Sequence, residues 1–468
     1  MVFNSIFFFI TLLPFLVFYF IGRNKRSATK KLSILFYSYF FYGMWNPGFL
    51  ALIMISTVID YWAARGIVAY PQRKKIFLII SLITNLGLLG FFKYFEFFIN
   101  TVTYILTSIG VNWSPPMLNI LLPIGISFYT FQALSYTIDV YRDRISAERN
   151  LLDIAVFVAF FPQLVAGPIV RASHFLPQLA KEPIIRIKNI ADGILLILFG
   201  LFLKNVVAAN VAPHVNNLFS NWQSNDILDN WLAGMLFGVQ IYGDFNGYSL
   251  IAIGLAKILG FDVLKNFNAP YAAAGFSDFW RRWHISLSTW LRDYLYISLG
   301  GNRRGTRRTY WNLMITMLLG GLWHGASFMF IIWGGLHAVY LCAERLLRQH
   351  IHVLIENRII QRLLLVLFII ITYLTVSITW IPFRSETAEQ CLGMMKGLFY
   401  GKLYLQNGFL SGYLIVIVVF ILHCVSRQYD FFIHVERNST VRFTAMTIII
   451  FFLYFCSGER TDFIYFQF

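Results

Sequence analysis

Two histidines lie in sequence contexts that could support proton transfer. His324 lies in the glycine-rich stretch 320–326, Gly-Gly-Leu-Trp-His-Gly-Ala, midway along an apolar stretch at 313–340. Glycines let the backbone turn and let a substrate approach closely. A neutral imidazole at such a bend can take a proton from a hydroxyl group, which is what acyl transfer to an alcohol requires. The alternative is an imidazole satisfied by a neighbouring helix, and the residues alone favour neither interpretation.

His284 is the second candidate. It lies in residues 279–286, Phe-Trp-Arg-Arg-Trp-His-Ile-Ser, which mix aromatic, cationic and hydroxyl side chains. Arg281 and Arg282 could bind the phosphates of a donor such as coenzyme A or phosphopantetheine. The alternative is an amphipathic helix at the membrane interface with snorkelling arginines, and this segment alone favours that alternative.

Other polar residues inside apolar runs favour structural roles. Asp244 should have a partner, either an arginine or a backbone amide, because a lone carboxylate in a bilayer is costly. Gln163 either lines a cavity or satisfies a broken helix, and His337 is expected to serve helix packing. We expect no metal site, because the histidines show neither HxxxH nor HExxH spacing. Without Walker A or GxSxG sequences, nucleotide hydrolysis and serine-hydrolase chemistry are unsupported.

The composition indicates an integral membrane protein. Hydrophobic residues make up 58% of the 468-residue chain and charged residues 13%, so lipid must cover much of the surface. The net charge of +16 does not indicate nucleic acid, because the basic residues sit in short loops beside apolar runs, as in cytoplasmic loops of membrane proteins. The four cysteines lie far apart and should be free. The apolar run 2–21 lacks signal-peptide features and is expected to be a retained span.

Alternating apolar runs and basic loops predict an all-α, polytopic membrane protein with about 11–13 transmembrane or re-entrant helices. Residues 33–66 should hold two runs broken near Asn46-Pro47, and residues 310–345 a hairpin with His324 at its turn. The stretch 151–170 has basic residues on both flanks, which predicts a buried or re-entrant segment. The arginine-rich stretch 261–309 should face the cytoplasm. We expect one membrane domain over residues 1–468.

Several motifs together resemble those of the membrane-bound O-acyltransferase family. The closest branch includes the membrane subunit of alginate O-acetyltransferase, with peptidoglycan O-acetyltransferases and the teichoic acid D-alanyl transfer protein nearby. The resemblance covers nearly the whole chain and is carried by residues 160–169, 242–245, 278–288, 320–325 and 462–468.

The resemblance implies that His324 is the catalytic histidine and His284 the second histidine of the family. It also implies a central tunnel in which a cytoplasmic thioester, acetyl-CoA or another donor, meets an extracytoplasmic polysaccharide acceptor. No bound cofactor is expected. The implied partners are membrane lipid and a separate periplasmic acetyltransferase, and the implied location is the bacterial inner membrane, crossed many times.

The chain ends in residues 463–468, Phe-Ile-Tyr-Phe-Gln-Phe. The favoured interpretation is that these aromatics anchor the tail in the membrane interface. In the alternative, the tail enters the outer mouth of the tunnel and Tyr465 carries the acyl group transiently, which would need a nearby base.

Two other functions remain open at this stage. D-alanyl transfer from a carrier protein to teichoic acid would use the same chemistry. A transporter without chemistry would also contain broken helices and midplane polar groups, but the sequence shows no inverted repeat.

Overall fold

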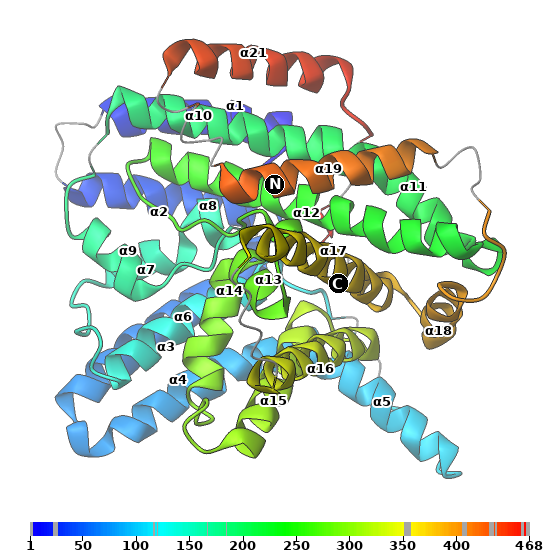
Figure 1. Cartoon of the computed structure of the whole chain (residues 1–468). Helices are drawn as coiled ribbons and strands as arrows, with labels where there is room; N and C mark the ends of the chain where they lie inside the picture. Colours follow the sequence, from blue (N-terminus) through cyan, green and yellow to red (C-terminus); the bar gives the residue numbers. More distant parts are fainter. Residues whose placement is uncertain are drawn as a thin grey trace. The chain divides into compact units, whose positions relative to one another are not determined.

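The computed structural model describes residues 3–21, 27–115, 118, 120–165, 167–183, 185–350, 357–404, 410–429, 435, 438–459, 463 and 464. Every regular element in these ranges is helical, which confirms the all-α prediction (Figure 1). The chain divides into two compact units. The first unit comprises Met1–Ile194 and Ile251–Leu264, and the second comprises Leu195–Leu250 and Lys265–Phe468. The single membrane domain expected from the sequence stays a prediction.

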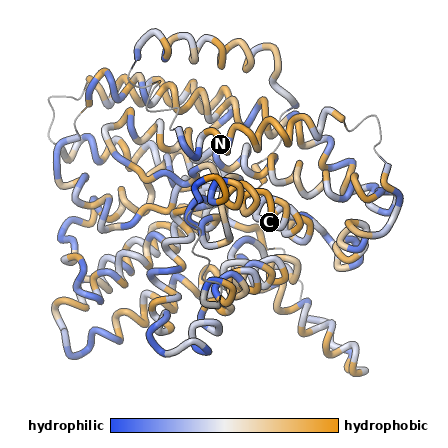
Figure 2. The backbone as a smooth tube through the Cα atoms, in the orientation of Figure 1, coloured by the Kyte–Doolittle hydropathy of each residue, from blue (hydrophilic) through white to orange (hydrophobic). Residues whose placement is uncertain are grey.

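Six helical stretches are long and apolar enough to cross a membrane, and two shorter helices, Ile6–Ile21 and Ser439–Phe455, are also apolar. The six are Pro47–Ala69, Pro71–Ser108, Ile187–Ser220, Phe328–Arg348, Arg358–Arg384 and Leu410–Gln428. Hydrophobic residues run along most helices, and hydrophilic ones gather in many of the loops and helix ends (Figure 2). The chain is therefore a multi-pass membrane protein.

The first unit is built around helix α3. Its elements are α1 (Ile6–Ile21), α2 (Ser27–Gly43), η2 (Pro47–Phe49), α3 (Leu50–Ala69), η3 (Pro71–Arg73), α4 (Lys74–Leu89), η4 (Gly90–Tyr94), α5 (Phe95–Ser108), α6 (Ile126–Tyr141), α7 (Leu151–Ala159), α8 (Phe161–Leu164), α9 (Ala172–Leu179) and the start of α10 (Ile187–Phe202). Helix α3 packs against α4, α6 and α7. The predicted break near Asn46-Pro47 is confirmed, because α2 ends before it and Asn46 caps η2.

A buried carboxylate joins three helices of this unit. Asp60 on α3 is fully buried and accepts hydrogen bonds from Ser81 and Asn85 on α4 and from Thr137 on α6, the last two at 2.8 Å. Neutral donors on adjacent helices thus pair with the Asp60 carboxyl group, whose burial without hydrogen-bond partners would cost free energy. The stretch predicted to be buried or re-entrant forms α7 and α8, whose side chains are buried almost throughout.

The second unit holds both candidate histidines. Its elements are the end of α10, η5 (Leu203–Ala208), α11 (Ala209–Ser220), η6 (Trp222–Ser224), most of α12 (Ile227–Ile258), η7 (Pro270–Ala272), α13 (Phe276–Arg282), α14 (Ile285–Trp290), η8 (Leu291–Tyr296), α15 (Thr306–His324), α16 (Phe328–His350), α17 (Arg358–Arg384), α18 (Ala388–Gly397), α19 (Leu410–Gln428) and α21 (Ser439–Phe455). Asparagine side chains cap α17 and α21 at their first turns, as the sequence pattern of helix starts favours.

Helices α15 and α16 form the predicted hairpin and lie side by side (Figure 1). Small residues let their backbones approach closely. A Cβ atom at Gly334 would lie 2.3 Å from the Met317 carbonyl oxygen, and one at Gly321 would lie 2.2 Å from the Phe330 carbonyl oxygen. Within a membrane the hydrophobic effect does not drive helices together, and close packing at small residues is a common way for them to associate. The hairpin therefore depends on glycine at both positions.

Two adjacent glycines of α16 test this dependence. Gly334→Ala should lower the free energy of unfolding by about 1–3 kcal/mol, because backbone atoms must move to admit the methyl group. Gly335→Ala is the matched control, since the nearest atom to a Cβ there is the Leu318 Cδ2 at 3.5 Å. The measurement is the unfolding temperature of each purified variant in detergent. Equal temperatures for the two variants would contradict the close packing.

Candidate active site

His284 occupies a strained backbone position between two short helices. Helix α13 ends at Arg282 and α14 begins at Ile285, and His284 has a φ of +42°, in the left-handed region. Non-glycine residues rarely adopt this conformation, and such strain concentrates at functional sites. The surrounding backbone fixes it: Asn268 N–H donates to the Arg282 carbonyl and Ile285 N–H to the Asn266 carbonyl, each at 2.9 Å. The backbone that carries the imidazole is thus held in place.

The His284 side chain is fully buried, yet its nitrogens are unsatisfied. Neither Nδ1 nor Nε2 has a hydrogen-bond partner within the described part of the chain. Buried polar atoms in native proteins are nearly always paired, so an exception indicates a place for a ligand or a water molecule. Residue 284 lies outside the membrane-spanning helices, and burial lowers the pKa of its imidazole to about 3. The ring is therefore neutral at physiological pH, with one nitrogen able to donate and the other to accept.

His324 lies beside it at the turn of the α15–α16 hairpin. The side chain is 2% exposed, and its ring centroid lies 6.3 Å from that of His284. Gly325 follows directly; a Cβ there would lie 2.1 Å from the Phe330 ring, so only glycine fits. The hairpin turn predicted at residues 323–325 is confirmed, and the structure brings the two predicted histidines together.

Aromatic side chains from several helices enclose the two imidazoles. Trp323 and Trp333 lie 5.0 Å from the His324 ring, and Phe383 of α17 lies 5.3 Å from it. Phe245 of α12 stands edge-on to His284 at 4.6 Å. We call these four side chains the aromatic box. They exclude water from the two imidazoles, which strengthens any electrostatic interaction made there.

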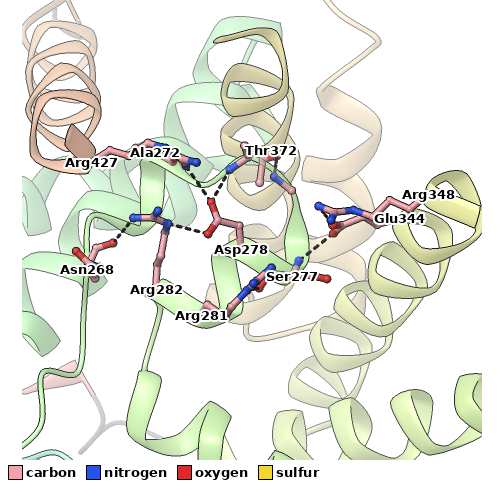
Figure 3. A network of polar contacts seen from close by, with 12 residues as sticks. Asn268, Ala272, Ser277, Asp278, Arg281, Arg282, Glu344, Arg348, Thr372 and Arg427 are labelled. Carbon is pink, nitrogen blue, oxygen red and sulfur yellow. Dashed lines mark hydrogen bonds and ion pairs between the residues drawn. The ribbon is translucent and has the colours of Figure 1, made fainter. Parts of the chain in front are cut away.

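A polar network anchors the segment that leads to His284 (Figure 3). Asp278 on α13 pairs with Arg282 and with Arg427 of α19, each at 2.9 Å, and accepts the Ala274 N–H at 3.0 Å. Burial alone would raise the pKa of Asp278, but these hydrogen bonds and the two guanidinium groups hold that pKa below its usual value. The carboxylate therefore stays charged and joins α13 to α19.

The same segment is tied to two further helices. Ser277 N–H donates to Glu344 of α16 at 2.9 Å, and Glu344 also pairs with Arg348. Gly275 N–H donates to Thr372 of α17 at 2.8 Å (Figure 3). Contacts from α16, α17 and α19 thus fix the approach to His284 on three sides.

Comparison with known proteins identifies the family. The model of the membrane-bound O-acyltransferase family matches residues 32–381. The chain belongs to this family. It is accordingly an O-acyltransferase, and both motifs that carry the histidines lie within the matched residues.

Relatives within the family differ in similarity to this chain. It is 42% identical over 404 residues to the probable alginate O-acetylase AlgI of Pseudomonas aeruginosa, covering 85% of this chain and 75% of the relative. It is 35% identical over 431 residues to the peptidoglycan O-acetyltransferase of Helicobacter pylori, covering 85% and 80%. The teichoic acid D-alanyltransferase of Bacillus subtilis is 28% identical over 239 residues, which cover 48% of this chain and 60% of the relative.

The two predicted donor-binding arginines have different surroundings. Arg282 donates to Asp278 and to the Asn268 carbonyl, so its guanidinium already serves the network around Asp278. Arg281 is exposed and donates to the Ser277 carbonyl at 3.1 Å. Donor binding by either residue stays a prediction, and the contacts favour Arg281 for it.

Asp244 has the backbone partner predicted for it, but its charged partner is a lysine. Lys204 of η5 forms a buried ion pair with Asp244, and the Ile464 N–H donates to the same carboxylate at 2.7 Å. An arginine was the charged partner expected from the sequence. The signal for Lys204 was available, because it is a single cation inside an apolar run, and such a residue needs a partner.

The remaining predicted residues lie as follows. Gln163 donates to the Phe157 carbonyl at 2.9 Å and so satisfies the broken helix in the first unit. His337 contacts Thr379 of α17 through Nε2 at 3.1 Å, which agrees with helix packing. All four cysteines are free, as predicted. Tyr465 lies outside the described residues.

The neighbouring arginines give a test of the site. Arg282→Gln should lower the free energy of unfolding by about 1–3 kcal/mol, because Asp278 loses one charged partner. Arg281→Gln should leave stability unchanged and raise the KM for the thioester donor. Unfolding temperature and donor KM, measured for both variants, separate the two roles. A stable Arg282→Gln variant with an unfolded Arg281→Gln variant would reverse the assignment.

Proposed function

We propose that this O-acyltransferase moves acetyl groups from a cytoplasmic thioester donor towards an extracytoplasmic polysaccharide. One observation carries the proposal: two buried imidazoles lie 6.3 Å apart inside the aromatic box, and the nitrogens of one of them, His284, lack partners among the described residues. Relatives named for alginate and peptidoglycan O-acetylation cover 85% of the chain and support acetyl transfer to a glycan hydroxyl.

His324 acts as the general base in this proposal. Its imidazole takes the proton from the acceptor hydroxyl while the hydroxyl oxygen attacks the thioester carbonyl carbon. The carbon–sulfur bond breaks, an ester forms, and the thiolate takes up the proton to leave as a thiol. The surrounding aromatic side chains keep competing water away from the thioester.

His284 positions the reacting carbonyl. A neutral imidazole carries one N–H, and with no partner in the described structure that group can donate to the thioester carbonyl oxygen. A donor fixed in place before the reaction stabilises the negative charge that develops on this oxygen. The strained backbone of His284 supports this role, because rigid placement of the donor is what such stabilisation requires.

The donor is acetyl-CoA or another acyl thioester, approaching from the side of the exposed Arg281. A separate periplasmic acetyltransferase takes the acetyl group onward to the polysaccharide, and the chain works in the bacterial inner membrane.

D-alanyl transfer is the second candidate, favoured by relatives that match about half of the chain. Parallel assays with acetyl and D-alanyl thioesters decide between them by the rate of thiol release.

Substitution of the two histidines tests the assignment of their roles. His324→Ala should lower kcat for thiol release by about 10²- to 10⁴-fold, the usual contribution of a general base. His284→Ala should cause a smaller loss, because it affects positioning rather than proton transfer. His174→Ala serves as a control, since His174 lies on α9 and its imidazole contacts the Asp262 carbonyl and carboxylate. Full activity of His324→Ala would overturn the assignment, and the reverse order would make His284 the base.

Tyr465 is proposed as a transient acyl carrier. Its hydroxyl oxygen would attack the thioester carbonyl, lose its proton to His324 and release the thiol, leaving a tyrosyl acetyl ester for the partner enzyme. Tyr465→Phe keeps the ring and removes the hydroxyl, so it should abolish polymer acetylation, and mass spectrometry should find an acetyl ester on the wild-type tail. Normal acetylation by Tyr465→Phe would exclude the relay and favour an anchoring role for the tail.

A further inference from the structure

A buried ion pair lies at a close helix contact in the second unit. Lys204 and Asp244 pair with side chains that are 1% and 4% exposed. Lys204 lies in the π-helical turn η5, and Gly247 on α12 lets that turn approach, because a Cβ there would lie 2.7 Å from the Gly200 carbonyl oxygen. π-Helical turns within longer helices often mark functional sites. A buried ion pair contributes little net stability, so another reason for this one is needed.

The second contact of Asp244 supplies that reason. Its Oδ2 atom accepts the backbone N–H of Ile464 at 2.7 Å, so the ion pair holds a backbone group near the end of the printed sequence. Phe463 and Ile464 are 1% and 3% exposed. The sequence favoured a tail anchored in the lipid interface, whereas these two residues are buried within the second unit.

The preceding residues are tied to the same helices. Gly458 N–H donates to the Asn205 carbonyl at 2.9 Å, and the Asn210 side chain donates to the Cys456 carbonyl at 2.8 Å. Asn205 directly follows Lys204. Gly458 and Ile464 are therefore both hydrogen-bonded next to the ion pair.

The tail contacts reach the site through aromatic rings. The Phe463 ring lies 4.2 Å from Tyr248 and 6.1 Å from Phe245, centroid to centroid. Phe245 in turn stands edge-on to His284 at 4.6 Å. The Phe245 ring thus lies between Phe463 and the imidazole of His284.

We propose that Asp244, paired with Lys204, is a positioning residue that holds residues 463–464 against Phe245 and thereby fixes His284 for acyl transfer. We call this arrangement the tail latch. The ammonium group of Lys204 favours the ionised form of Asp244, and an ionised carboxylate is the stronger acceptor for the Ile464 N–H. The latch rests on the proposed role of His284, and it makes Phe463 and Ile464 part of the support of the site.

The most specific test removes the backbone N–H of residue 464 and leaves both side chains of the ion pair unchanged. Ile464→Pro lacks the backbone N–H, so Asp244 loses its contact to the tail. Its kcat for thiol release should fall about tenfold or more, with the donor KM changed less than twofold. Ile464→Val keeps the N–H and is the matched control, with kcat close to wild type. Equal kcat values for the two variants would overturn the latch.

A second test needs no enzymatic activity. The thiol of Ile464→Cys should react slowly with a maleimide, with modification at residue 464 located by mass spectrometry because Cys456 is exposed and also reacts. Adding Lys204→Met and Asp244→Leu together removes the acceptor without leaving a buried charge unpaired, and should speed labelling at 464 at least tenfold. Unchanged labelling would contradict the latch even if the proposed acetyl transfer is confirmed. Full activity of His324→Ala would overturn the proposed catalytic roles and would not alter this labelling result.

Discussion

A polar group buried among apolar side chains must find a partner, and this requirement organises the second unit. Lys204 pairs with Asp244, and Arg282 and Arg427 pair with Asp278. Each ion pair also binds backbone: Asp244 accepts the Ile464 N–H, and Asp278 accepts the Ala274 N–H. Each carboxylate therefore fixes the position of a chain segment that packing of apolar side chains alone would hold less precisely. Against this background, the site is marked by the imidazole nitrogens of His284, which have no hydrogen-bond partner among the residues that the structure describes.

The strain at His284 is maintained by what surrounds it. A left-handed backbone at a non-glycine residue costs on the order of 1–3 kcal/mol and persists only where neighbouring contacts over-determine it. Here the Asn266 and Asn268 backbones fix the chain on both sides, and the Asp278 network fixes the preceding helix. The result is an imidazole that cannot turn away to find a partner within its own segment. A substrate carbonyl would find it already oriented, which is the condition for efficient electrostatic catalysis.

Much of this arrangement could be predicted from the sequence. The hairpin around His324 followed from two apolar runs separated by glycine, and the break at Asn46-Pro47 from helix-breaking residues, since both are local signals. The choice of His284 and His324 as site residues came from family resemblance rather than from spacing, because forty residues separate them.

Other features depend on which side chains meet in the folded chain, and the sequence pattern did not identify these partners. The partner of Asp244 was expected to be an arginine or a backbone amide; the pattern could not show that a π-helical turn brings Lys204 to it. Arg282 was expected to bind a donor, yet an aspartate four residues earlier on the same helix occupies it. Trp333 and Phe383 are two among many aromatic residues, and only the packing of α16 and α17 reveals them beside His324.

The most direct test of the central claim is a two-sided assay in sealed vesicles that hold the purified protein in one orientation. A membrane-impermeant acetyl thioester is supplied on the face that carries Arg281, and a soluble glycan acceptor together with the partner acetyltransferase on the other. We expect free thiol on the donor face and acetyl ester on the opposite face in equal amounts, with both lost in His324→Ala. Intact thioester appearing on the acceptor face, or ester formation that survives His324→Ala, would contradict it.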